Sequence, residues 1–136
     1  MNSPRPLSPR PLSPHLGVYK FMYTMSLSIL HRMTGVATTV GFLLFAWWLM
    51  ALASGADAYD DAMRLLTTPF AKLLLVGFTF SFVYHFCNGI RHLVWDTGRG
   101  LERAQARRSG ALVVVAALLL TALVVWLGCN ALAVVR

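Results

Sequence analysis

The sequence predicts an all-α membrane protein with three transmembrane helices, and three observations support this fold class. Hydrophobic residues make up 57% of the 136 residues and charged residues only 12%, whereas about 25% of the residues of a soluble domain are charged. The segments 33–56, 73–90 and 109–135 contain no Asp, Glu, Lys or Arg. Each can cross a hydrocarbon core about 30 Å thick as a helix, which needs about 20 apolar residues. None shows the alternation over about 10 residues that is typical of barrel strands.

The helices are expected at about 26–55, 67–96 and 108–134, within one membrane-anchor domain that comprises residues 1–136. Five of the six prolines lie within the first 14 residues, so we expect residues 1–20 to form an extended arm. This arm has neither the apolar core of a secretory signal nor the amphipathic helix of a mitochondrial transit peptide. The pattern favours a bacterial inner membrane.

The basic residues predict the orientation of the helices. Four Lys and Arg and no acidic residue precede the first uncharged segment, and five Arg lie between the second and third, against Asp96 and Glu102. The connection 57–72 instead holds three Asp against Arg64 and Lys72. By the positive-inside rule, the N-terminus and the second connection face the cytoplasm, and the C-terminus faces the periplasm. The net charge of +7 thus has a membrane explanation, and no nucleic-acid partner is expected.

One face of the second helix carries a stripe of polar residues. His85 and His92 are seven residues apart, so they lie within roughly 20° of one another, and Gly89 and Asp96 fall on the same face. An ionisable group inside a bilayer usually has a functional partner, and imidazole is a ligand of haem iron. We therefore favour His85 as an axial ligand, with Gly89 leaving room for the macrocycle. The alternatives are that His85 hydrogen-bonds another helix, or that His92 is the ligand.

A second haem ligand is expected from another chain. His31 and His92 are the other histidines in or near the bilayer, and both are expected at the interface rather than at the depth of His85. His85 itself should lie about 9 Å deeper than Arg91, which is six residues further along the helix.

A second polar cluster lies at the start of the first helix. Ser28 and Arg32 are four residues apart, His31 lies between them and Gly35 follows one turn later. The guanidinium group offers a fork of donors for a carboxylate or a carbonyl oxygen. These residues suit haem propionates or a quinone carbonyl. Spacing alone favours a simpler interpretation as an interfacial anchor, in which Ser28 caps the helix and Arg32 extends to the headgroups.

Three motifs carry a family resemblance. The stretch SPHL at 13–16 followed by Tyr19, then SILHRMTG at 28–35, then HFCNGIRHLVWD at 85–96, closely resemble the cytochrome b556 subunit of succinate dehydrogenase, an anchor of respiratory complex II. The motifs extend over residues 13–96, in the order and spacing of that family. The pattern HxxxGIRHLxWD is specific.

The resemblance implies roles for individual residues. His85 matches the axial ligand of a haem b that is shared with a second anchor subunit, which supplies the other histidine. Ser28 and Arg32 match positions that help to form the ubiquinone pocket. His31 matches a position near the haem propionates, and Asp96 an acidic position near the quinone site. The chain would then be half of a heterodimeric haem-binding anchor bundle.

The resemblance also implies partners and a reaction. The chain would anchor a flavoprotein subunit and an iron–sulfur subunit to the lipid bilayer. Succinate would be oxidised in the flavoprotein, and electrons would reach quinone through the iron–sulfur subunit, so the chain is a subunit of an enzyme without a complete active site of its own. Two alternatives stay open: the anchor of a related fumarate reductase, and a non-redox small membrane protein that binds no haem.

Overall fold

The computed structural model describes residues 22–134, which form four helices. Three are long, namely α1 (Tyr23–Ser54), α3 (Pro69–Asp96) and α4 (Arg103–Val134), and α2 (Ala56–Leu66) is short. The three long helices are long and apolar enough to cross a membrane, and no strand occurs between residues 22 and 134. The predicted all-α membrane fold is confirmed. The expected arm, residues 1–20, lies outside the described residues.

The residues at which the long helices begin depend on helix propensity and capping residues, and differ from the starts of the uncharged segments. α1 starts at Tyr23 and α4 at Arg103, several residues before the expected starts. In α4 the arginines of the first turns explain this, because arginine is a good helix former and can extend its head to water. α3 starts at Pro69, where the Thr68 hydroxyl accepts a hydrogen bond from the Ala71 amide at 3.3 Å. A threonine cap followed by proline is a favourable helix start.

The short helix α2 was not expected, since its charged residues read as a loop. Gly55, with φ +115°, separates it from α1. The apolar side of α2 faces the bundle: Ala62 is buried, and the Tyr59 ring lies 6.4 Å from the Trp48 ring of α1. Tyr59 and Ala62 are three residues apart, the spacing of one helix face.

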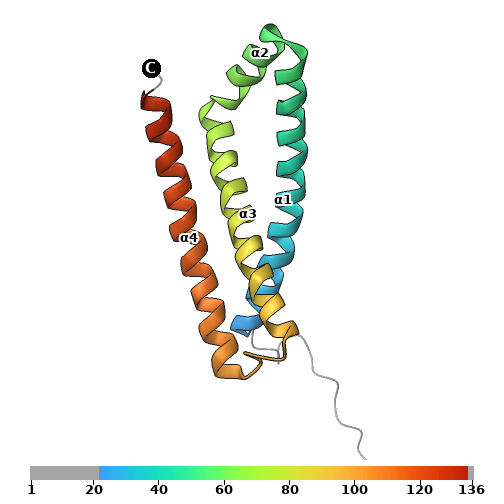
Figure 1. Ribbon diagram of the computed structural model, residues 1–136, viewed down its shortest axis with the longest axis vertical. Coiled ribbons are helices and arrows are strands. Elements are labelled where there is room, and N and C mark those ends of the chain that lie inside the picture. Colours follow the sequence, from blue (N-terminus) through green and yellow to red (C-terminus); the bar gives the residue numbers. More distant parts are fainter. Residues whose placement is uncertain (1–21, 135–136) are drawn as a thin grey trace, which may run out of the picture.

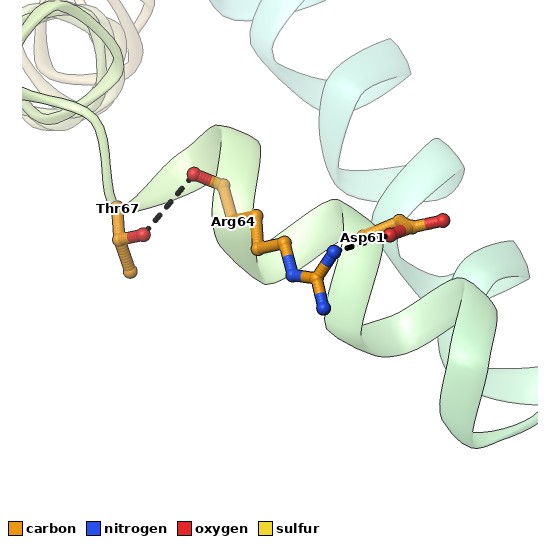
Figure 2. Close-up of polar contacts among 3 residues, drawn as sticks. All are labelled: Asp61, Arg64 and Thr67. Atoms are coloured by element: carbon orange, nitrogen blue, oxygen red, sulfur yellow. Dashed lines mark hydrogen bonds and ion pairs between the residues drawn. The ribbon is translucent and has the colours of Figure 1, made fainter.

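The outer side of α2 is polar. Arg64 Nη1 lies 3.5 Å from Asp61 Oδ1, and the Thr67 hydroxyl donates to the Arg64 carbonyl at 3.2 Å. Figure 2 shows both contacts. Both charged side chains are strongly exposed, so this ion pair contributes little to stability. The polar side of α2 suits a segment at the membrane surface.

α3 is the central helix of the bundle and packs against α1 on one side and α4 on the other (Figure 1). A small core joins α3 to α4 through Tyr84, Val113 and Ala117. The Tyr84 hydroxyl also donates to the Leu27 carbonyl of α1 at 3.2 Å. A Cβ on Gly110 would collide with the Leu27 side chain, so glycine permits the close approach of α4 to α1, as is common between membrane helices.

The start of α1, the end of α3 and the start of α4 gather at one end of the bundle, the lower end in Figure 1. The motif residues of both polar clusters belong to these segments. The fold therefore brings the two clusters to the same end of the molecule.

Candidate functional site

Three histidines from two helices form a stack. The His31 ring of α1 lies 4.1 Å from the His85 ring and 5.1 Å from the His92 ring, with interplanar angles of 13° and 18°. Seven residues of helix separate His85 from His92 by about 10.5 Å along α3. A ring this close to both must lie between them. His31 thus inserts between the two histidines of the stripe.

This arrangement corrects the expected depth of His31. We expected His31 and His92 at the interface and His85 alone at greater depth, but the ring of His31 contacts that of His85. α1 starts at Tyr23, so His31 lies more than two turns inside the helix. The start of the uncharged segment did not predict the level of His31 relative to His85, because the relative stagger of two helices depends on their packing.

A hydrogen bond to α1 orients the His85 ring. His85 Nδ1 lies 3.1 Å from the backbone carbonyl oxygen of His31. Because a carbonyl oxygen can only accept, Nδ1 must carry the hydrogen, and in the neutral ring Nε2 then has the free lone pair. Nε2 makes no hydrogen bond among residues 22–134. A backbone acceptor on one ring nitrogen is the usual support for a histidine that binds metal through the other.

The surroundings of His85 are compatible with a haem ligand. His31 Nδ1 is buried and has no hydrogen-bond partner among the described residues, so a polar group of a ligand could satisfy it. Gly89 has nothing within 4 Å of the position of a Cβ, which agrees with the expected open space beside His85. The stacked rings do not converge on one point, and within residues 22–134 no group of three or more His, Cys, Asp or Glu could hold a metal ion. Haem needs only one ligand from this chain.

The part of the histidine stripe at the C-terminal end of α3 is more exposed than His85. His92 is exposed, and its Nδ1 lies 2.7 Å from the Asn88 carbonyl of the same helix. The Trp95 ring meets it edge-on at 5.0 Å. Asp96 is the last residue of α3, is exposed, and has no ion pair within the described part of the chain. His92 therefore has the surroundings of an interfacial side chain.

Ser28 and Arg32 lie on α1 beside His31, and both are exposed. Their side chains make no hydrogen bond to any residue from 22 to 134. The predicted cap at Ser28 is wrong, because Met22 occupies the N-cap position and Ser28 lies in the second turn. Both side chains remain available to a ligand or to another subunit.

The sequence reasoning missed the best-connected polar residue of this end, Arg91. Its side chain is only 8% exposed. Nε donates to the Ser109 hydroxyl at 3.0 Å, Nη1 to the Asn88 side-chain oxygen at 3.2 Å and Nη2 to the Ala106 carbonyl at 2.8 Å. The guanidinium group also lies 4.0 Å from the Trp95 ring centroid.

A signal for this network was present in the sequence. Tyr84, Asn88, Arg91 and Trp95 recur at the spacing of one helix face, about a quarter turn from the histidine stripe. Trp95 Nε1 donates in turn to the Gly100 carbonyl at 3.0 Å. Arg91 thus ties the end of α3 to α4, and Trp95 ties it to the connection between the two helices.

An apolar cavity lies away from the histidines. It has a volume of about 450 Å³ and opens between α1, α2 and α3, among Trp48, Phe70, Leu74 and other apolar side chains. None of the residues of either polar cluster lines it. Its apolar lining suits an acyl chain or the side chains of another helix, and not the polar groups of a reaction.

Comparison with known proteins decides the family. Residues 6–124 match the model of the succinate dehydrogenase/fumarate reductase transmembrane subunit. The chain belongs to this family. The resemblance expected from the three motifs is therefore confirmed, and with it the interpretation of the long apolar helices as transmembrane segments.

Individual members of the family are similar over most of this chain. The succinate dehydrogenase cytochrome b556 subunit of Rickettsia prowazekii is 44% identical over 111 residues, which are 81% of this chain and 86% of that protein. The subunit of the same name from Paracoccus denitrificans is 35% identical, with 88% of each chain covered. The mitochondrial cytochrome b560 subunit of human succinate dehydrogenase is 39% identical over 85% of this chain and 66% of its own length.

Proposed function

We propose that this chain is the membrane-anchoring cytochrome b subunit of a succinate:quinone oxidoreductase, and that His85 is an axial ligand of haem b. Family membership and the names of the relatives support the anchor role. The observation that supports the haem ligand is the geometry of His85, whose Nδ1 is bonded to the His31 carbonyl while Nε2 bonds to none of the described residues. A haem bound there supplies a one-electron redox centre.

The other site residues of the proposal lie at the same end of the bundle. His31 stacks on the proposed ligand, and its buried Nδ1 has no partner in the described part of the chain, which suits a propionate of the haem. Ser28 and Arg32 would bind the carbonyl oxygens of ubiquinone, because their donors are exposed and bond to no residue between 22 and 134. A positive charge beside a carbonyl stabilises the negative charge that develops on it during reduction. Asp96, exposed at the end of α3, would lie near the quinone.

The proposal includes the partners and the membrane. A second anchor subunit would supply the other haem ligand, since the other imidazoles within residues 22–134 are stacked or bonded to their own helix. The flavoprotein would oxidise succinate, and the iron–sulfur subunit would deliver electrons to quinone near Arg32. The complex would lie in a bacterial inner membrane, with the N-terminus of this chain in the cytoplasm.

The family includes anchors of fumarate reductase, in which quinol is the electron donor. The relatives compared above are all named as succinate dehydrogenase subunits. This agreement favours succinate oxidation as the physiological direction.

The test is the replacement His85→Ala in the complex, purified with its partner subunits. A reduced-minus-oxidised spectrum should show the b-type haem bands in the wild type and lose most of them in the variant. His92→Ala is the matched control, because it removes an exposed imidazole of the same stack and should leave the haem content close to normal. Full haem in His85→Ala would contradict the proposed ligand, and a wild type without haem and without partner subunits would contradict the proposed function.

A further inference from the structure

Gly35 of α1 touches the proposed ligand directly. A Cβ built on Gly35 would lie 2.9 Å from Cε1 and 3.3 Å from Nδ1 of the His85 ring. Cβ contacts shorter than about 3.0 Å do not occur in well-packed proteins, so the ring lies where only glycine leaves space. By contrast, Cβ atoms on Gly77 and Gly89 of α3 would have no neighbour within 4 Å.

Two further contacts prevent the ring from moving aside. The His31 carbonyl holds Nδ1 at 3.1 Å, and the His31 ring covers one face at 4.1 Å. His31 and Gly35 are four residues apart, so the hydrogen-bond acceptor and the glycine lie on one face of α1. A methyl group at position 35 would push the ring from the acceptor that sets its orientation.

We propose that Gly35 is a positioning residue for His85, because the missing side chain lets the ring lie against α1 with Nδ1 on the His31 carbonyl and Nε2 directed to the haem iron. This inference rests on the proposed function. In this proposal a residue of α1 sets the orientation of the His85 ring, which belongs to α3. Gly35 acts through the orientation of His85 and does not itself contact the iron.

The first experiment compares Gly35→Ala with the control Gly77→Ala in the complete complex. Both variants add the same methyl group to a helical glycine. Gly35→Ala should retain haem roughly tenfold less tightly, the scale expected when one methyl group overpacks a tight site, and the remaining haem should show a shifted midpoint potential and low-spin electron paramagnetic resonance signal. Gly77→Ala should match the wild type in all three. Wild-type values in Gly35→Ala, or equal changes in both variants, would overturn the inference.

The second experiment separates the ring contact from a general packing role of Gly35. In the His85→Ala background the ring is gone, so adding Gly35→Ala should not change the melting temperature of the complex further, whereas it should lower that of the wild type. An equal decrease in both backgrounds would overturn the inference. If Gly35→Ala alone does not assemble, the double variant should assemble as His85→Ala does, and its failure to do so would also overturn it.

The two experiments distinguish this inference from the proposed function. Loss of haem in His85→Ala together with a normal spectrum in Gly35→Ala would overturn the positioning role and leave the proposed function intact. Full haem in His85→Ala would overturn both.

Discussion

Arg32 and Arg91 belong to the same end of the bundle, but their surroundings differ completely. Arg91 is 8% exposed and donates to three oxygen atoms of α3 and α4. Arg32 is exposed and donates to no residue of the described chain. An arginine whose three nitrogen atoms all donate to its own chain serves the fold, whereas one with free nitrogens is available to a ligand. The quinone role proposed for Arg32 follows from this difference.

Arg32→Ala should therefore lower quinone reduction and leave succinate oxidation with a soluble dye unchanged. A hydrogen bond to a charged group contributes about 1.5–3 kcal/mol, so the decrease should be roughly 10- to 100-fold. The measurement is the ratio of quinone-linked to dye-linked activity in the purified complex. Arg64→Ala, at α2, is the control and should keep the wild-type ratio. Equal loss of both activities in Arg32→Ala would argue against a quinone role.

At the scale of the elements, α3 has two different faces. His85 and His92 face the His31 ring of α1, whereas Tyr84 and Arg91 lie on a face about a quarter turn away and contact α4. Because one helix carries both faces, the attachment to α4 also determines how the histidines meet α1. Arg91 is thus a structural support of the site and not part of it.

Arg91→Leu should lower the stability of the chain by roughly 2 kcal/mol, because three interhelical and intrahelical hydrogen bonds are lost, each contributing about 0.6 kcal/mol or more between membrane helices. Thermal unfolding of the purified protein in detergent measures the change. The control is Arg99→Leu, which removes an exposed arginine from the connection between α3 and α4. This variant should melt as the wild type does. Identical melting of the two variants would mean that the network contributes nothing.

At the scale of the whole molecule, charge separates the two ends. The end that holds the start of α1, the end of α3 and the start of α4 (Figure 1) carries Arg32, Arg99 and the arginines of the first turns of α4. The other end carries the three aspartates of α2. Between them the surface is apolar, with large hydrophobic side chains exposed along all three long helices. This distribution suits a lipid bilayer and the proposed orientation.

The orientation can be tested with reporters fused to the C-terminus in bacterial cells. Because α4 would end in the periplasm, a fused alkaline phosphatase should be active and a fused green fluorescent protein should not fluoresce. Fusions within the connection at Gly98, on the cytoplasmic side, should give the opposite pattern and serve as the control. Active phosphatase at Gly98 would contradict the proposed orientation.

The sequence by itself determined the three long helices, the gathering of polar motifs at one end, and the family. Hydropathy over a segment as long as a bilayer is a local property, so it predicts a membrane helix without knowledge of its neighbours. The motifs at 28–35 and 85–96 are equally local. Helical periodicity also placed His85, His92 and Asp96 on one face before the fold was known.

Only the tertiary structure decided how the helices meet. The insertion of His31 between His85 and His92, the contact of Gly35 with the His85 ring and the burial of Arg91 all depend on the stagger and rotation of one helix relative to another. Periodicity within one helix contains no information on these two quantities, which are set by the packing of side chains from different segments. The short helix α2 belongs with them, because it gains its stability from burying Ala62 and Tyr59 against the bundle and not from its own length.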